Sequence, residues 1–218
     1  MENKSIPIFP CFFFPNIEYF QYLNGFDNVL IETCETFPKQ TFRNRTYIFS
    51  ANGVLSLNIP IIKNTNLREK TSEVRICYKD NWNIKSYRAI TSSYGRSPYF
   101  EFFEEDIKYF FMKKYDKLLD LNMDILLYFN NIFKINANIR MTNFYVNSES
   151  IEKKELDFRN YFHTKELLNK NSDSQFVKYI QCFEQKHGFI ANLSCLDLLF
   201  NIGLDSISYI KNTSKSII

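Results

Sequence analysis

The sequence lacks paired cysteines, a strong net charge and any long hydrophobic run, and each absence excludes a class of protein. Its five cysteines are widely spaced and form no Cys-x-x-Cys pair, so neither a zinc site nor a disulfide framework is indicated. Reduced thiols in the cytoplasm are the simplest interpretation. The 27 basic and 24 acidic residues leave a net charge of +3, which predicts no dedicated surface for nucleic acid.

No stretch reaches the roughly 18 uncharged apolar residues that a membrane span needs. The first 20 residues are partly apolar, but prolines and an early Glu and Asn interrupt them. They are too short and too broken for the apolar region of a signal peptide. We therefore expect a soluble, cytoplasmic protein without a membrane span.

The motifs of common cofactor and catalytic sites are also missing. Neither a G-x-G-x-x-G fingerprint nor a P-loop occurs, so the cofactor, if there is one, stays unknown. No serine lies in a nucleophile-elbow context. The two histidines, His163 and His187, are far apart and have no partner at ligand spacing, so we expect no metal site.

What the sequence has in abundance is aromatic residues, with 23 Phe and 14 Tyr. We expect the aromatic run 12–14 to lie in the core. A chain of 218 residues fits one domain over 1–218 and can bury about 70% of its unfolded surface without disulfides or metals. Residues 147–174 are polar and show little periodicity, which predicts a mobile connection within this domain.

The first 61 residues predict a βαβ unit followed by a hairpin. Residues 6–9 and 28–33 are apolar and short enough for strands, and a helical pattern begins at Ile17 between them. The crossover of such a unit is right-handed. Ala51-Asn52-Gly53 then separates two strand-like runs, which is a strong hairpin signal.

Helical spacing of apolar residues predicts most of the remaining elements. We expect Ser97-Pro98 and Ser194 to start helices. The fold class is then α/β: a single three-layer domain with a largely parallel sheet, an N-terminal βαβ unit, a hairpin near Asn52-Gly53 and a helical C-terminal half. The expected later elements are helices over 82–94, 97–112, 115–133, 176–185 and 195–202, and a strand over 139–142.

Three stretches resemble motifs of one bacterial family. Residues 13–20, FFPNIEYF, are similar to its N-terminal motif, and residues 32–45 look like its most distinctive block, Glu-x-x-Glu-x-Phe-x-Lys-Gln-Thr-Phe-Arg-Asn-Arg. Residues 186–203 resemble the C-terminal motif of a Bacteroidetes-type branch. The family is the WbqC-like protein family, and the resemblance covers essentially the whole chain.

The resemblance implies a role in the biosynthesis of bacterial surface polysaccharides of the O-antigen type. A transferase that uses an activated sugar or acyl donor is the expected activity. The alternative is a non-catalytic protein of the same pathway that binds a nucleotide sugar or a partner enzyme. Cys34 stands where the family often has a histidine, and this favours the alternative slightly.

Basic and amide side chains cluster over 39–45. If this stretch is extended, Arg43 and Arg45 share a face, and two guanidinium forks suit a phosphate or a carboxylate. We therefore expect an anionic small molecule, such as a nucleotide-activated sugar, to bind here. The alternative is that these cations are solvated or form ion pairs with Glu32 and Glu35.

Glu32 and Glu35 follow the second predicted strand. Open α/β sheets place their ligand sites at the carboxyl ends of strands. One carboxylate could act as a general base while the other orients a cation. Salt bridges to neighbouring Arg and Lys side chains are the alternative.

The C-terminal motif contributes two further candidates. His187 could act as an acid or base because its usual pKa lies near neutrality, or it could simply end a helix before Gly188. Asp197 could hold a substrate hydroxyl, or it could cap the helix that begins at Ser194. The candidate catalytic residues are thus Glu32, Glu35 and His187, and the candidate substrate-binding residues are Lys39, Arg43, Asn44, Arg45 and Asp197.

Overall fold

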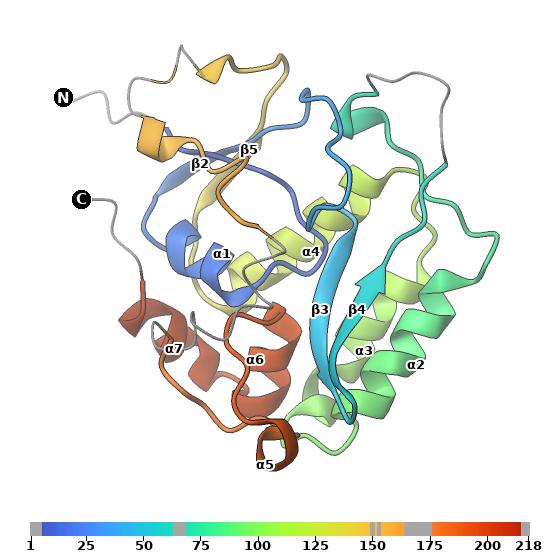
Figure 1. Ribbon diagram of the computed structural model, residues 1–218. Helices are drawn as coiled ribbons and strands as arrows, with labels where there is room; N and C mark the ends of the chain where they lie inside the picture. The colour runs from blue at the N-terminus through green and yellow to red at the C-terminus, as the bar shows by residue number, and fades with distance from the viewer. Residues whose placement is uncertain (1–5, 63–68, 149–150, 152–153, 164–175, 215–218) are drawn as a thin grey trace.

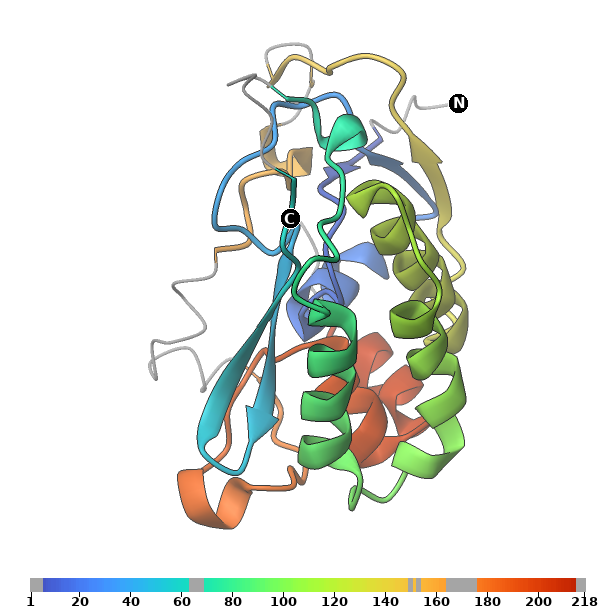
Figure 2. The same cartoon turned by 90° about the vertical axis from the view of Figure 1, so that its right-hand side faces the viewer.

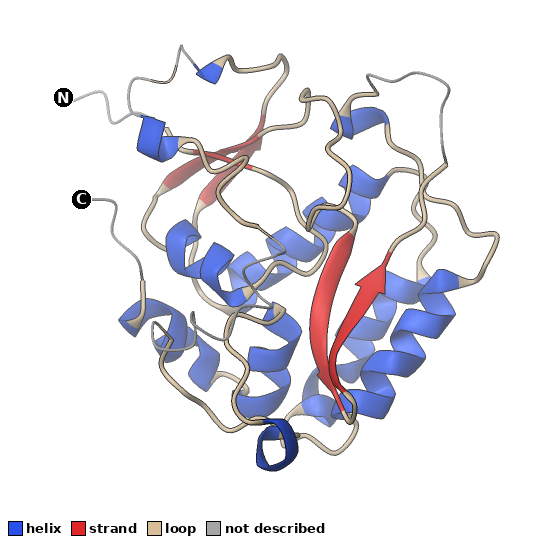
Figure 3. Ribbon diagram, viewed as in Figure 1, coloured by secondary structure: helices blue, strands red, loops and turns tan. Residues whose placement is uncertain are grey.

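The computed structural model describes residues 6–62, 69–148, 151, 154–163 and 176–214 (Figure 1). It confirms the mixed α/β fold class, with a small parallel sheet, an antiparallel hairpin and a helical C-terminal half (Figure 3). The elements in chain order are β1 (Ile8–Phe9), α1 (Ile17–Leu23), β2 (Asn28–Ile31), β3 (Arg45–Ser50), β4 (Gly53–Asn58), η1 (Thr71–Glu73), α2 (Trp82–Tyr94), α3 (Phe100–Met112), α4 (Leu118–Ile132), β5 (Asn138–Met141), η3 (Lys154–Leu156), α5 (Glu184–His187), α6 (Cys195–Ile202) and α7 (Asp205–Asn212).

Strands β1, β2 and β5 form the parallel sheet, with β2 in the centre. The predicted βαβ unit is confirmed, since α1 connects the parallel strands β1 and β2. After β5 the chain returns to the other edge of β1, where Asp157 forms a parallel bridge with Ile8 and the Phe158 N–H donates to the Ile8 carbonyl. The spatial order is therefore β5, β2, β1 and Asp157: strands are added on one side of β1 up to β5, and the next segment, at Asp157, is added on its other side.

Strands β3 and β4 form the predicted hairpin. The turn closes between Ser50 and Gly53, and only Gly53 in this turn has a positive φ, of 97°, a conformation that glycine adopts without steric cost. The Thr46 hydroxyl donates to the carbonyl of Phe14, and the Phe49 N–H donates to the hydroxyl of Tyr94. These bonds attach the hairpin to the N-terminal segment and to α2, which lies beside it in Figure 2.

The core consists largely of phenylalanine rings, and the run 12–14 is buried in it as predicted. Phe14 stacks on Phe111 of α3 with ring centroids 5.6 Å apart, and Phe20 meets Phe133 edge to face. Burying one such ring stabilises the fold by about 1.5–3 kcal/mol. The abundance of Phe is therefore used for packing between α1, α3 and α4.

Two predicted helices are wrongly placed, and the helix predicted over 115–133 begins three residues late, at Leu118. Helix α3 begins at Phe100 rather than after Ser97-Pro98, because the Ser97 hydroxyl donates back to the Tyr94 carbonyl instead of capping a helix. The predicted helix over 176–185 is not present, and only Glu184–His187 is helical there. Tyr179 and Gln181 in this segment donate hydrogen bonds to Asp197 of α6, and these contacts outweigh the local helical pattern.

Part of the segment predicted to be mobile packs into the core. Within 154–163, Phe158 and Phe162 are buried, and Phe158 stacks on Phe9 with ring centroids 4.2 Å apart. Residues 149–150, 152–153 and 164–175 lie outside the described residues. Among the helices that the structure describes, none is both long enough and apolar enough to cross a membrane.

The stacking of Phe158 on Phe9 gives a test of this packing. Phe158→Ala should lower the free energy of unfolding by about 3–5 kcal/mol, because it removes a buried ring and leaves a cavity. Urea denaturation measures the change. Phe144→Ala is the matched control, since Phe144 is 74% exposed and its loss should change stability by less than about 0.5 kcal/mol. Equal, small effects of both variants would show that 154–163 is not docked.

Candidate functional site

Buried charges gather at the carboxyl ends of the parallel strands. Glu32 directly follows β2 and is fully buried. Its carboxylate accepts hydrogen bonds from the Cys34 N–H (2.8 Å), the Thr142 hydroxyl (3.0 Å) and the Val146 N–H (3.1 Å). A fourth donor is the guanidinium of Arg159, 3.3 Å away. The carboxylate is therefore surrounded by donors that belong to the protein.

Arg159 is the cation that organises this end of the molecule. Its Nε and Nη2 atoms donate to the two carboxylate oxygens of Asp157 at 2.7 and 2.6 Å, and its Nη1 donates to the Val146 carbonyl. Burial raises the pKa of Asp157, but its bonds to Arg159 outweigh this and hold that pKa below its usual value. Sequence reasoning missed Arg159 because it lies in the polar segment 147–174, and its only local signal is the aromatic residues around it.

Glu35 and Arg43 form a second buried ion pair. The Arg43 side chain is 2% exposed, and its Nε lies 2.7 Å from the Glu35 carboxylate. The Arg43 Nη2 donates to the main-chain carbonyl of Arg159, so the two ion pairs are joined. Burial raises the pKa of Glu35, and the charge of Arg43 opposes that shift.

The other members of the 39–45 cluster lie in different surroundings. Lys39 is exposed. The Asn44 side chain donates to the Ile59 carbonyl, and the half-buried Arg45 donates to the side chain of Asn58 at 2.6 Å. Arg43 and Arg45 therefore do not present two equivalent guanidiniums, and their joint role in binding an anion stays a prediction.

The crevice that the fold would offer to a ligand is filled with rings. Ligands of open α/β sheets bind where the chain order reverses at the carboxyl ends of the strands, which here is the gap between β1 and Asp157. Phe12 and Phe162 meet there edge to face at 5.8 Å, and Phe158 packs against both Phe9 and Phe162. This position therefore belongs to the core.

His187 lies at the other end of the hairpin. It is exposed and ends α5, with Gly188 following at φ 78°. Its Nε2 atom lies 3.0 Å from the carbonyl oxygen of Ala51 in the hairpin turn. Strand β3 separates Arg45 from Ala51 by about 20 Å, at roughly 3.3 Å per residue. The structure therefore does not bring His187 together with the 39–45 cluster.

Asp197 is fully buried on α6, among polar side chains. Its carboxylate accepts from the hydroxyls of Tyr94 and Tyr179 at 2.8 and 2.5 Å and from the Gln181 amide at 2.8 Å. Burial raises the pKa of Asp197, and these hydrogen bonds oppose the shift. Among the described side chains, no cation pairs with this carboxylate.

The capping role considered for Asp197 is wrong, whereas that of Ser194 is confirmed. The Ser194 hydroxyl accepts from the Leu196 N–H at the start of α6. The Ser194 N–H, which a capping box would pair with Asp197, donates instead to the carbonyl of Tyr47. The N–H that a capping box would use is therefore bonded to strand β3 of the hairpin.

A cleft of about 1180 Å³ lies beside the Asp197 cluster. We call it the α2–α6 cleft, because its walls are the end of α2, the turn after it, residues 180–185, the hairpin turn and one residue of α6. Hydroxyl and amide side chains dominate its polar lining, and among the described residues Arg96 is its one guanidinium and Glu184 its one carboxylate. Its polar side chains are Thr91, Ser92, Ser93, Arg96, Gln181, Glu184, Gln185 and Asn201.

The cleft is linked to Asp197 by two of its lining residues. Gln181 donates to the Asp197 carboxylate, and Asn201 donates to the Asp197 carbonyl at 2.7 Å. Cys182 also lines the cleft, but burial raises the pKa of its thiol to about 11, so the thiol stays protonated near neutral pH and is a poor nucleophile. No spacing in the sequence distinguishes Arg96 or Gln181 as site residues.

The described part of the chain contains no group of three or more His, Cys, Asp or Glu side chains placed to hold a metal ion. A family model described as the WbqC-like protein family matches residues 11–157, about two thirds of the 218 residues. The chain belongs to the WbqC-like protein family. No curated protein and no solved structure matches it.

The match divides the candidate residues of this WbqC-like protein into two groups. Residues 11–157 contain Glu32, Glu35 and Arg43. His187 and Asp197, by contrast, lie beyond the matched residues, as do 180–185, which form one wall of the α2–α6 cleft. Matched and unmatched segments therefore meet at this cleft.

The Glu35–Arg43 pair leads to a pH-dependent prediction. Arg43→Met should lower the free energy of unfolding by about 3–5 kcal/mol at pH 7.5, because it leaves Glu35 buried without its cation. Burial already raises the pKa of Glu35 in the folded state, and the loss of Arg43 raises it further. A raised pKa in the folded state lowers the free energy of unfolding as pH rises above the pKa of the unfolded chain. Urea denaturation should therefore show a smaller loss near pH 4.5.

The control for this prediction is the double variant Glu35→Gln, Arg43→Met, which should recover part of the loss at pH 7.5. A loss that is equal at both pH values would contradict the assigned charge of Glu35.

Asp197 gives a second pH-dependent prediction. Its raised pKa in the folded state means that the contribution of Asp197 to stability is greatest at low pH and falls as pH rises through the interval above about 4. Asp197→Asn should remove this fall relative to wild type in urea denaturation from pH 4 to 8. Asp205→Asn is the control, because Asp205 is exposed at the start of α7. Parallel stability curves for wild type and Asp197→Asn would contradict the raised pKa of Asp197.

Proposed function

We propose that this protein acts in the cytoplasm in the synthesis of a bacterial surface polysaccharide, as a transferase that binds a nucleotide-activated sugar in the α2–α6 cleft. Membership of the WbqC-like family supports the pathway. The observation that carries the choice of site is the cleft itself, whose volume of about 1180 Å³ is just above the usual range for ligand sites, roughly 300–1,000 Å³. A cleft of this volume has room for a sugar joined to a nucleoside diphosphate.

The lining of the cleft suits both parts of such a ligand. Hydroxyl and amide side chains such as Ser92 and Asn201 can pair with sugar hydroxyls. Arg96 is exposed, and within the described residues its guanidinium has no hydrogen-bond or ion-pair partner. A guanidinium fork free of protein carboxylates is suited to a diphosphate.

His187 is the residue to which we assign proton transfer. A carbonyl oxygen can only accept, so the 3.0 Å contact with Ala51 requires the proton on Nε2 and leaves Nδ1 as the basic atom. Ala51 lines the cleft, whereas His187 is not part of the lining and lies beside it through this contact. In the proposed step Nδ1 takes the proton of an acceptor hydroxyl, whose oxygen bonds to the anomeric carbon as the nucleoside diphosphate leaves.

The remaining candidates have structural roles that need no substrate. Glu32, Glu35 and Arg43 are buried in ion pairs, and their participation in catalysis stays a prediction. Asp197 acts through Gln181, whose position it holds. An acyl donor activated by a nucleotide would offer the same phosphates to Arg96.

The second candidate function is a non-catalytic protein that binds the same nucleotide sugar. It is favoured by Cys34, at a position where the family resemblance implies a histidine, and the Cys34 N–H donates to Glu32. Such a protein would bind its ligand without turnover.

A panel of nucleotide sugars in a thermal-shift assay tests the site. A true ligand should stabilise the wild type by about 2.7 kcal/mol at a hundredfold excess over Kd. Arg96→Ala should abolish the shift, whereas Arg45→Ala, a matched loss of one guanidinium at the far end of the hairpin, should leave it unchanged. The opposite result would assign the ligand to the 39–45 cluster and would rule out the cleft as its binding site.

Turnover of the same ligand then separates the two functions. His187→Gln should lose product formation by at least about a hundredfold, the usual contribution of general acid–base catalysis, while the thermal shift persists. Binding without any product in the wild type, across acceptor sugars, would support the non-catalytic alternative.

A further inference from the structure

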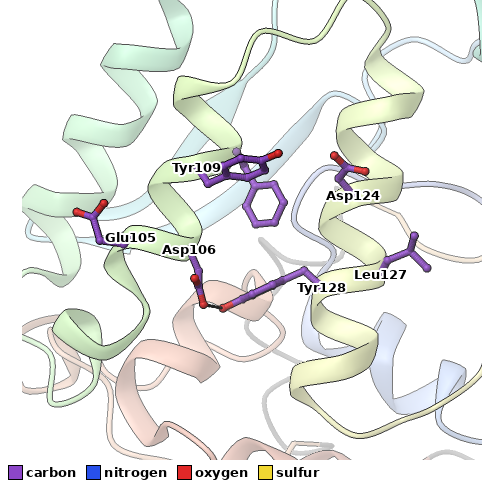
Figure 4. A pocket seen from close by; sticks show the side chains of 7 residues that line it. Glu105, Asp106, Tyr109, Asp124, Leu127 and Tyr128 are labelled. Atoms are coloured by element: carbon purple, nitrogen blue, oxygen red, sulfur yellow. Dashed lines mark hydrogen bonds between the residues drawn. The ribbon is translucent and has the colours of Figure 1, made fainter.

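Helices α3 and α4 form a groove that combines aromatic rings with carboxylates (Figure 4). The groove has a volume of about 450 Å³. Tyr128 of α4 reaches across it to donate to Asp106 of α3 at 3.0 Å. The other labelled side chains that line it are Glu105, Tyr109, Asp124 and Leu127.

Large apolar side chains on these two helices are exposed rather than packed. Phe102 is 77% exposed, Tyr109 53%, Leu127 48% and Met112 42%. Positions 102, 109 and 112 follow helical spacing along one side of α3, and they extend over about 15 Å at 1.5 Å per residue. Contiguous exposed apolar side chains of this kind mark interaction surfaces.

The same two helices are strongly acidic. Together they contain six Asp or Glu residues and one Lys, a net charge of −5, in a chain whose net charge is +3. The Glu105 side chain is 80% exposed, and among the described residues its carboxylate pairs with Lys108 on its own helix. The Asp124 side chain is 41% exposed; its carboxylate pairs with Lys113 and accepts from the Tyr115 hydroxyl at 2.8 Å. Exposed pairs of this kind are weak, so a cation from a partner can compete for these carboxylates.

We propose that the α3–α4 groove binds a basic amphipathic helix of a partner protein. Apolar side chains of that helix would lie on Tyr109 and Leu127, and its Lys or Arg residues would meet Glu105 and Asp124. The negative charge disfavours nucleic acid and anionic lipid. A symmetric pair of chains would bring the carboxylates of this groove close to their own copies, so this face does not suit self-association through a twofold axis.

This surface is independent of the proposed catalytic function. The lining of the α2–α6 cleft contains no residue from α3 or α4. Substitutions in the groove should therefore leave nucleotide-sugar binding unchanged, and failure of one proposal would not affect the other.

Fluorescence anisotropy with a designed peptide tests the proposal. The probe is a helical Leu/Lys amphipathic peptide of about 18 residues, long enough to form a helix, and its control carries Glu in place of Lys. We expect the Lys peptide to bind the full chain at least tenfold more tightly than the Glu peptide. Leu127→Ser and Tyr109→Ser should each weaken binding at least tenfold.

Matched controls keep the outcome specific. Leu204 and Val177 are each 58% exposed elsewhere on the molecule, so Leu204→Ser and Val177→Ser should not change binding. Glu105→Lys should reduce the preference for the Lys peptide, and an unchanged circular dichroism spectrum shows that each variant is folded. Equal binding of the two peptides, indifference to Leu127→Ser, or a wild-type dimer that Leu127→Ser dissociates would each overturn the proposal.

Discussion

The buried contact between Glu32 and Arg159 joins residues 127 positions apart and holds the late segment 154–163 against the sheet. An ionised carboxylate without partners would be very costly to bury, so its position requires all four of its donors. Arg159 in turn supports Asp157, and its main-chain carbonyl accepts from Arg43. The carboxyl ends of the strands, the crossover of the chain and the stacking of Phe158 on Phe9 therefore depend on one set of linked charges.

A second buried carboxylate organises the opposite end of the hairpin by other means. Asp197 has hydroxyl and amide donors instead of a cation, and these come from α2 and from the irregular segment before α5. Strand β3 connects the two ends, since Thr46 bonds the N-terminal segment and Phe49 bonds Tyr94. The molecule thus has an ion-paired end, where the charges are satisfied internally, and a polar end, where the cleft is open.

Local signals in the sequence were sufficient for the elements that depend on neighbouring residues. The βαβ unit, the hairpin at Gly53, helix α2 and the Ser194 cap were predicted because apolar periodicity, positive φ and capping act over a few residues. The start of α3 and the helix expected over 176–185 were mispredicted. In both places a hydrogen bond or a buried polar contact with another segment outweighs the local preference.

The sequence by itself determined the family, the α/β class and a first set of candidate side chains, which did not include Arg96 or Arg159. Only the tertiary structure decided which of them are enclosed: Glu32, Glu35 and Arg43 are buried in ion pairs, whereas Arg96, which no motif marks, is exposed at a cleft. The physical reason is that burial and pairing are set by contacts between distant segments. Local sequence does not distinguish Arg159, which the fold buries in ion pairs, from Arg96, which it leaves exposed at the cleft.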